Sequence, residues 1–272
     1  MPAPDLSPPP PFETPERALH VHLHAKLVMP QELAGGVVVV IDNLRASVTM
    51  TAALFSGAAE VVPVLTVEDA VRMREANGDP APGVVRDEPS LARRALMGGE
   101  RGGVLIPGFD LDNSPRAYTR ERVQGRTIIF TTVNGTAALL QSRLAARVLV
   151  GSFANLSAVC ASVANDPRPV HLLCCGTREE ISLDDVLPAG AMAQRLIAQG
   201  RNHTSDDSAR LAIAAYEGIA TGGLLAAMRA SRGGRNLERV GLGPDVEFCS
   251  RIDTMPVVPE FDGRRVVLSL AQ

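Results

Sequence analysis

The sequence predicts an α/β fold in which helices cover both faces of a largely parallel sheet. Short β-branched runs alternate with helical stretches along the chain, a pattern typical of parallel strands joined by crossover helices. The last two extended runs, residues 254–260 and 264–270, are joined by an Asp262-Gly263 turn, which predicts a hairpin. This hairpin indicates an antiparallel edge, so we expect a mixed sheet.

The composition is typical of one folded domain that follows a tail. The 272 residues are 46% apolar, which is ample for a core of Val, Leu, Ala and Ile. Residues 1–18 are rich in proline, which removes backbone donors and favours extended structure. No interdomain linker follows the tail. We therefore expect disorder over 1–18 and a single domain over 19–272.

Charge and hydropathy argue against two classes of partner. The net charge of −3 and the lack of basic patches with interleaved aromatics give no support for nucleic-acid binding. No run of 18 or more apolar residues is present, so no membrane span is expected. The four cysteines form no C-x-x-C pair, which favours free, mostly buried thiols. Because no secretory signal is visible, we expect a cytoplasmic protein.

The first half of the chain shows the alternation clearly. Residues 37–41 form a continuous β-branched run, as expected of a strand buried on both faces. Further strands are expected at 19–28, 61–64, 104–106 and 127–131, and helices at 47–57, 66–77, 116–122 and 137–145, with a Pro- and Gly-rich loop at 79–88.

The second half continues the same pattern. Strands are expected at 147–150 and 171–175, and helices at 155–165, 183–199, 208–220 and 221–230, followed by a Gly-rich basic loop at 231–237. Ser182 would cap the helix at 183–199, and acids are favourable in the first turn of such a helix.

His20, His22 and His24 alternate along the first strand and would share one face of it. Two histidines at this spacing can share a metal ion. The alternative is the solvated face of an edge strand, and we favour it because the remaining histidines lie in no motif.

Polar residues follow the buried strand at 37–41. In open α/β sheets, ligands bind at the carboxyl ends of the strands, so Asp42 is well placed for a metal or a phosphate. Arg45 and Ser47 lie about one helical turn further on, although Ser47 could simply cap the next helix. Burial of a carboxylate is costly unless it is paired or liganded, which favours a functional role for Asp42.

A second polar cluster follows the strand at 127–131. Thr131, Thr132, Asn134, Gly135 and Thr136 stand where this strand gives way to a helix. A helix N-terminus supplies free N–H groups, so the cluster could cradle an anion. An ordinary Asn-Gly turn with a threonine cap is the alternative.

The stretch 98–115 is the densest in functional groups. Paired glycines bracket Glu100 and Arg101, a short apolar run follows at 104–106, and a polar turn with Asp110, Asp112, Asn113 and Ser114 ends at Pro115. The pattern predicts a loop, a strand and a second loop. It is compatible with a ligand site and also with two turns around one buried strand.

Several of these stretches together resemble the 2-phosphosulfolactate phosphatase family. Residues 40–47, VIDNLRAS, resemble its IDVLRAT/S element, and 99–103 with 108–115 resemble GERGG and GFDLGNSP. Residues 131–136 are similar to TTTNGT, and 174–187 to CAG followed by FSLEDVL. Residues 233–237, GGRNL, and 245–249, DVEFC, are also similar to segments of this family. The elements occur in the family's order from about residue 20 to the end.

The resemblance implies a magnesium-dependent phosphatase with a three-layer α/β/α fold and a mixed sheet. Its family substrate is (2R)-phosphosulfolactate, which is hydrolysed to sulfolactate and phosphate on the route to coenzyme M. Family habit also suggests a homodimer. Six residues depart from the family pattern: Asn43, Asp112, Val133, Ala137, Cys175 and Asp184. Two of them matter most: Ala137 stands where an arginine is usual, and Asp112 adds a negative charge beside the site. Both departures concern the substrate more than the reaction type.

A polyanionic phospho-acid requires cations and N–H donors. Magnesium prefers oxygen ligands, and the candidates are Asp42, Glu100 and Asp110, which are also the predicted catalytic residues, with Asp185 behind them. Arg45, Arg101 and Arg235 are the candidates for bidentate contacts with substrate anions. The other predicted substrate contacts are Ser47, Asn113, Ser114, Thr131, Thr132, Asn134, Gly135, Thr136 and Gly176.

The mechanism and the exact substrate stay open at this level. A metal-bound water with a carboxylate as base would suffice, and a phospho-aspartyl intermediate on Asp42 is the competing route. The D-x-D pattern of haloacid dehalogenases is absent, because Leu44 stands at the second position. A phosphatase for another small phospho-acid and a non-catalytic anion-binding module are the alternative functions.

Overall fold

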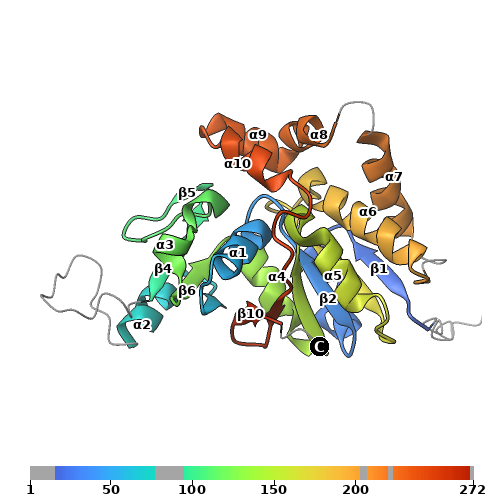
Figure 1. The fold of residues 1–272 in the computed structure, drawn as a ribbon, viewed down its shortest axis with the longest axis horizontal. Helices are drawn as coiled ribbons and strands as arrows, with labels where there is room; N and C mark the ends of the chain where they lie inside the picture. The colour runs from blue at the N-terminus through green and yellow to red at the C-terminus, as the bar shows by residue number, and fades with distance from the viewer. Residues whose placement is uncertain (1–15, 77–94, 203–206, 220–222, 270–272) are drawn as a thin grey trace, which may run out of the picture.

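The structure is a computed structural model that describes residues 16–76, 95–202, 207–219 and 223–269 (Figure 1). Most of the predicted tail, residues 1–15, and the predicted loop at 79–88 lie outside these ranges. Ala18 is buried and pairs with Asn202, so the folded part begins slightly before the predicted boundary at residue 19.

The α/β prediction is confirmed by a ten-stranded mixed sheet with helices on both faces. The strands are β1 Leu19–His22, β2 Val37–Ile41, β3 Glu60–Pro63, β4 Leu96–Arg101, β5 Val104–Leu105, β6 Thr127–Thr131, β7 Arg147–Gly151, β8 Val170–Cys174, β9 Pro259–Phe261 and β10 Val266–Leu268. Their order is β1-β8-β2-β7-β9-β10-β3-β6-β4-β5. Every residue of β2 is buried, as its β-branched run predicts.

The C-terminal hairpin corrects one expectation. We expected it at an edge of the sheet, but β9 and β10 lie in the interior, between β7 and β3. β9 pairs antiparallel with β7, and β10 pairs antiparallel with β3. The hairpin thus joins two parallel blocks, β1-β8-β2-β7 and β3-β6-β4. Backbone hydrogen bonds carry no side-chain signature, so the sequence pattern does not reveal where a hairpin pairs.

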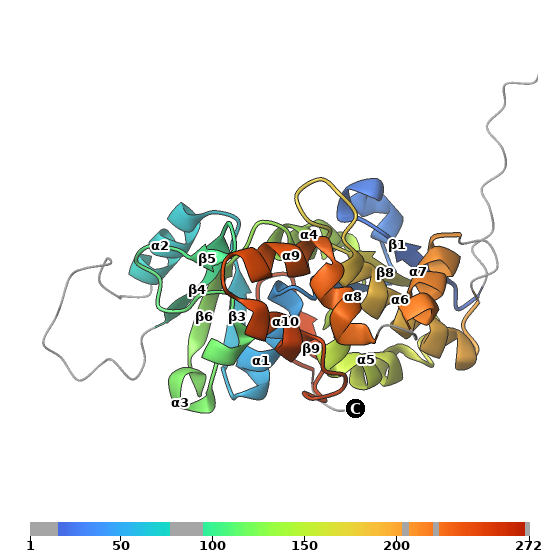
Figure 2. The same cartoon turned by 90° about the horizontal axis from the view of Figure 1, so that it is seen from above.

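Helices form the outer layers (Figures 1 and 2). Their bounds are α1 Ala46–Phe55, α2 Val67–Ala76, α3 Arg120–Val123, α4 Gly135–Gln141, α5 Leu156–Val163, α6 Leu183–Ala198, α7 Asp207–Gly218, α8 Leu224–Ala230, α9 Arg232–Arg239 and α10 Gly243–Cys249. α1 and α4 share a core with one face of the sheet, and α5, α6 and α7 share a core with the other. A smaller core lies under α2. No helix within the described part of the chain is long and apolar enough to cross a membrane.

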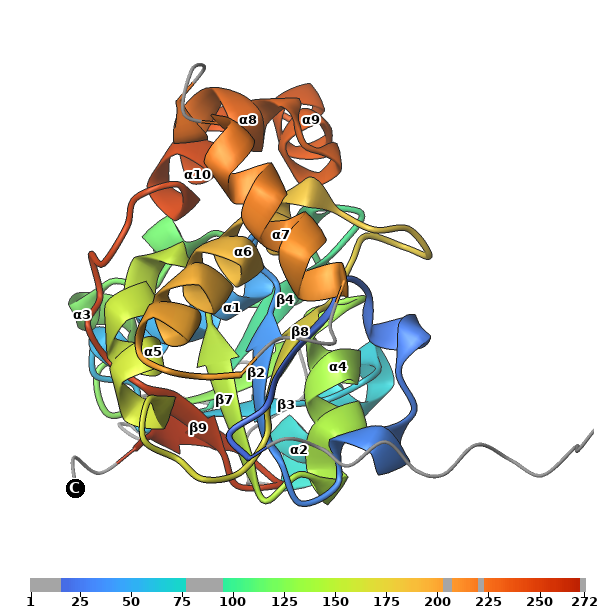
Figure 3. The same cartoon turned by 90° about the vertical axis from the view of Figure 1, so that its right-hand side faces the viewer.

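Helices α8, α9 and α10 lie together at one end of the molecule, as Figure 3 shows. We call residues 224–249 the C-terminal cap. The segment 231–237, predicted as a loop, is helical in α9, where the Ser231 side chain caps the helix by accepting from the Gly234 N–H. A Cβ on Gly234 would lie 1.9 Å from the Met228 carbonyl oxygen. Gly234 therefore serves close helix packing rather than loop flexibility.

The stretch 98–115 also differs from its predicted loop–strand–loop pattern. Residues 98–101 belong to β4, and Gly99 reaches a φ of 142° against the β6 backbone at Thr131. A strand was expected at 104–106; it is the two-residue hairpin strand β5, whose Val104 and Leu105 are exposed, which contradicts the alternative of one buried strand between two turns. The paired glycines thus allow close strand packing and a tight turn, not two flexible loops.

The histidines of β1 lie on an edge strand, which is the alternative that we favoured over a metal site. β1 is the terminal strand of the sheet, and the rings of His20 and His22 stack with His171 of β8. His24 leaves this face, because its buried ring packs against Gly176 at the end of β8. No group of three or more metal-ligating side chains suited to an ion occurs among the described residues.

Candidate active site

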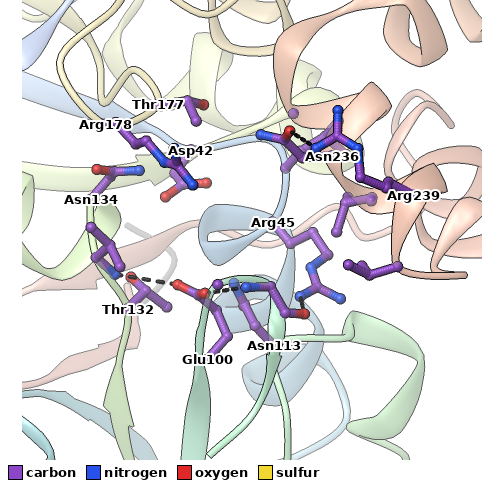
Figure 4. A pocket seen from close by; sticks show the side chains of 17 residues that line it. Asp42, Arg45, Glu100, Asn113, Thr132, Asn134, Thr177, Arg178, Asn236 and Arg239 are labelled. Carbon is purple, nitrogen blue, oxygen red and sulfur yellow. Dashed lines mark hydrogen bonds between the residues drawn. The ribbon is translucent and has the colours of Figure 1, made fainter.

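A cavity of about 280 Å³ opens where the two parallel blocks meet the C-terminal cap. Its lining includes Asp42 after β2, Glu100 in β4, Thr132 after β6, Thr177 after β8 and Asn236 in α9. Figure 4 shows these side chains pointing toward a common space. The carboxyl ends of strands from both blocks therefore supply one site.

Asp42 is the carboxylate that closes β2. Its backbone N–H donates to Ser47 Oγ at 2.9 Å, and its Oδ1 accepts from the Ala46 N–H at 3.2 Å. No described residue donates a hydrogen bond to its Oδ2. A Cβ on Gly135 would lie 2.8 Å from that oxygen and 2.7 Å from the Ala46 Cβ, so glycine is required there. Asp42 is thus held rigidly, with one oxygen available to a ligand.

The electrostatic environment of Asp42 is negative. Burial raises the pKa of this carboxyl to about 7, and the charges of Asp184 and Glu100 act in the same direction. The hydrogen bond from Ala46 and the charge of Arg45 lower it in part. A group of buried acids with too little positive charge near it is suited to a cation.

Glu100 faces the same space from β4. Its Oε2 accepts from the Gly103 N–H at 2.7 Å, and its Oε1 accepts from the Val133 N–H at 3.3 Å. The β4–β5 turn, with Gly102 and Gly103 at positive φ, brings the Gly103 N–H back onto the carboxylate. Two backbone donors therefore fix the orientation of Glu100.

Asn113 contributes an unsatisfied oxygen. Its side chain is buried and lines the cavity, and its Oδ1 has no hydrogen-bond partner within the described part of the chain. Its backbone carbonyl accepts from Thr49 Oγ1 at 2.8 Å, which anchors the loop to α1. A buried amide oxygen without a partner is costly unless a ligand or a water satisfies it.

Asp184 and Asp185 lie behind the cavity at the start of α6. Both Asp185 oxygens accept backbone N–H groups, Oδ1 from Asn43 at 2.9 Å and Oδ2 from Gly176 at 2.8 Å. Burial raises the pKa of Asp185 well above its usual range, and Asp184 and Asp42 add to the shift. Asp185 thus ties the ends of β2 and β8 together, while Asp184 accepts from the Gly233 N–H of the C-terminal cap at 3.1 Å.

The structure brings some of the sequence-predicted residues together and leaves others aside. Those that line the cavity are Asp42, Arg45, Glu100, Asn113, Thr132 and Asn134. Those that do not are Ser47, Arg101, Asp110, Ser114, Thr131, Gly135, Thr136, Gly176, Asp185 and Arg235. Several of the second group nevertheless shape the site: Ser47 fixes the Asp42 backbone, and Gly135 leaves room for its carboxylate.

Asp110 and Arg101 do not line the cavity, and their side chains have partners within the fold. Asp110 Oδ2 pairs with Arg74 Nη1 at 3.0 Å and accepts from the Met97 N–H at 2.9 Å. The Arg101 guanidinium donates to the Glu100 and Leu65 carbonyls and to Thr131 Oγ1. We therefore leave both residues out of the proposed ligand set.

The turn residues have local partners as well. Thr136 Oγ1 donates to the Thr132 carbonyl at 2.7 Å, which closes the first turn of α4. Ser114 Oγ donates to Asp245 Oδ1 at 2.7 Å, and Asp112 Oδ1 accepts from the Ser114 N–H at 3.0 Å. Asp112 does not line the cavity. It shapes a turn rather than adding charge to the site, contrary to our expectation.

Sequence reasoning missed four polar lining residues: Thr177, Arg178, Asn236 and Arg239. The first two follow β8 directly, so the rule that ligands bind at strand carboxyl ends applies to them as it does to Asp42. The last two share a face of α9 at a spacing of three residues, which is visible only once this segment is recognised as a helix. Arg235, on the same helix, faces away and donates to the Ala230 carbonyl.

Comparison with known proteins shows which proteins this chain is similar to. A family model described as 2-phosphosulpholactate phosphatase matches residues 23–264. The chain belongs to the 2-phosphosulpholactate phosphatase family. It is 40% identical to a "Probable 2-phosphosulfolactate phosphatase" of Symbiobacterium thermophilum over 238 residues, which are 88% of this chain and 96% of that protein. A protein of the same description from Deinococcus radiodurans is 36% identical, with 85% and 90% covered.

Membership of the 2-phosphosulpholactate phosphatase family implies a magnesium ion, and the residues present fit one. Magnesium usually takes one or two protein carboxylates and keeps waters and substrate oxygens as its other ligands. The orphaned Asn113 Oδ1 and the Glu100 carboxylate are hard oxygen donors on the cavity wall, and Asp42 lines the same cavity. The lack of a larger ligand cluster among the described residues is compatible with this mode.

Proposed function

We propose that the protein is a Mg²⁺-dependent phosphatase that hydrolyses (2R)-2-phosphosulfolactate to sulfolactate and phosphate, on the route to coenzyme M. The observation that carries the proposal is the Asp42 carboxylate, rigidly held with one free oxygen at the carboxyl end of a buried strand. The family and the names of the relatives support the same substrate.

The residues of the proposed site have different roles. Asn113 and Glu100 would hold the cation, which when bound supplies positive charge against the phosphate oxygens, and Asp42 Oδ2 would stay free for the reaction. Thr132 and Asn134 line the wall next to Asp42 and would contact the same oxygens. Arg45 is engaged with Asp245 and the Gly103 carbonyl, so it would fix the walls of the site rather than move toward the substrate.

Two routes for the reaction use the same oxygen of Asp42. In the first, a water transfers its proton to Oδ2 as its oxygen bonds to phosphorus. The ester P–O bond then breaks, and the alkoxide of sulfolactate takes up that proton. In the second, Oδ2 itself attacks phosphorus and forms a phospho-aspartyl group that water hydrolyses. Acid quench of a single turnover followed by mass spectrometry of the protein distinguishes them, since only the second route adds a phosphoryl group.

Phosphate release from 2-phosphosulfolactate, measured with Mg²⁺ and with EDTA, tests the function. We expect release with Mg²⁺ only, and a loss of at least about 100-fold in kcat for Asp42→Asn, which removes the base or nucleophile. The matched control is Asp69→Asn, a partly exposed acid of α2 that does not line the cavity, which should keep full activity. Full activity in folded Asp42→Asn would refute the assignment.

A panel of other small phospho-acids separates the alternatives. Faster turnover of another phospho-acid would keep the reaction and change the substrate. Metal-independent binding with no phosphate release from any compound would favour the anion-binding module instead.

A further inference from the structure

Two arginines line the cavity without an acidic partner among the residues that the structure describes. Arg178 lies in the turn after β8, and Arg239 ends α9. Neither forms a salt bridge with any carboxylate of the described residues, and the only hydrogen bond of the Arg239 guanidinium is to Asn236 Oδ1 at 3.2 Å. The third lining arginine, Arg45, is neutralised by Asp245 at 2.6 Å. Arg178 and Arg239 are thus the uncommitted cations of the described cavity wall.

These cations lie apart from Glu100. In Figure 4, Arg178, Asn236 and Arg239 lie in the upper part of the view, while Glu100 and Asn113 lie below them. Asp42 lies in the upper part as well, near Arg178 in this view, and Arg239 lies across the view from both. The cavity wall therefore offers acids that suit a cation and two separate guanidinium groups that suit groups with negative charge of their own.

The wall that carries the two arginines is one connected unit. Arg178 has a φ of 61°, a conformation uncommon for a residue with a side chain. The turn that holds it is closed by the Thr177 N–H, which donates to the Glu180 carbonyl at 3.0 Å. Glu180 in turn forms an ion pair with Arg232 of α9. The turn after β8 and the helix of Arg239 are therefore linked by side chains that lie outside the cavity lining.

We infer that Arg178 and Arg239 bind the free acid groups of the substrate, the sulfonate and carboxylate, and so select phosphate esters of small acids over uncharged esters. The inference rests on the proposed function and assigns it two specificity-determining residues. A planar guanidinium donates two parallel hydrogen bonds to a sulfonate or carboxylate. Without these cations, the acid groups would meet only the field of Asp42, Asp184 and Glu100, which repels them.

The test uses three ligands that divide the substrate into parts. They are 2-phosphosulfolactate, isopropyl phosphate, which lacks both acid groups, and sulfolactate, which lacks the phosphate. For Arg178→Gln and Arg239→Gln we expect KM for 2-phosphosulfolactate to rise about 10- to 100-fold, the effect of losing a charged hydrogen bond. Turnover of isopropyl phosphate should stay within about twofold, and sulfolactate should bind about 10-fold more weakly by calorimetry.

Arg143→Gln is the control, because Arg143 is an exposed arginine in the turn after α4 that does not line the cavity. Unchanged KM and unchanged sulfolactate affinity in both variants would overturn the inference. An equal loss with both phosphate esters would also overturn it, since the arginines would then serve the phosphate or the fold. If the unaltered protein binds sulfolactate but releases phosphate from neither ester, the proposed function itself has failed, which is a distinct result.

Discussion

Arg45 and Asp245 form a buried ion pair that joins the segment after β2 to the C-terminal cap. Arg45 Nη1 lies 2.6 Å from Asp245 Oδ2, and both side chains are 1% exposed. Arg45 Nη2 also donates to the Gly103 carbonyl at 2.7 Å, and Asp245 Oδ1 accepts from Ser114. The Arg45 guanidinium thus connects the first parallel block to the β4–β5 turn and to α10.

Breaking this pair should destabilise the fold. In Asp245→Asn the Arg45 charge stays buried without its partner, so we expect the free energy of unfolding to fall by about 3–5 kcal/mol in urea titrations. The control on the same helix is Glu247→Gln. Its pair with Arg251 is about half exposed, so the change should stay below about 1 kcal/mol. Equal effects of the two substitutions would contradict a special role for the buried pair.

The pH dependence of stability should reveal the buried charge of Asp42. Because its pKa is raised from 3.8 to about 7, the folded protein holds a proton that the unfolded chain releases between these values. The contribution of this group to stability therefore falls as pH rises from about 4 to about 7. Asp42→Asn does not titrate, so its stability relative to the unaltered protein should rise over this range. Urea titrations in EDTA at pH 5, 6, 7 and 8 measure the difference, and a constant difference would contradict the shift.

Gly135→Ala should damage the site through a single methyl group. The added Cβ would meet Asp42 Oδ2 and the Ala46 Cβ below 3 Å, so α4 or the carboxylate must move. We expect a loss of about 1–3 kcal/mol in stability and a fall in kcat, measured by thermal unfolding and phosphate release. Gly218→Ala is the matched control, because a Cβ there meets nothing within 4 Å. Retention of full activity in Gly135→Ala would show that Asp42 tolerates displacement.

Asp110→Asn should affect stability and leave the metal requirement unchanged. Its partner Arg74 has a side chain 1% exposed, and two of its nitrogens already have no hydrogen-bond partner. Removing the Asp110 charge should cost about 1–3 kcal/mol of stability. The Mg²⁺ concentration for half-maximal phosphate release should stay within about twofold. A tenfold rise in that concentration would restore Asp110 to the ligand set.

The sequence by itself determined the local features of this protein. Residues adjacent in the chain determine the buried strand β2, the Asp42 carboxylate that follows it and the helix after that. The hydrophobic pattern predicts the strand and the helix, and the cost of burying a carboxylate indicates a role for Asp42. The family elements likewise predicted Asp42, Glu100, Asn113 and Thr132, which the structure gathers in one cavity.

Only the tertiary structure decided which of the other candidates face that cavity. Whether an arginine reaches a ligand depends on carbonyls and acids distant in sequence. Arg101 is engaged by Leu65 and Thr131, and Asp110 by Arg74, whereas Arg178 and Arg239 have no acidic partner among the described residues. The insertion of β9 and β10 between the two parallel blocks depends on backbone pairing across more than a hundred residues. Such pairing is selected by the global packing of the sheet, which no local pattern of side chains records.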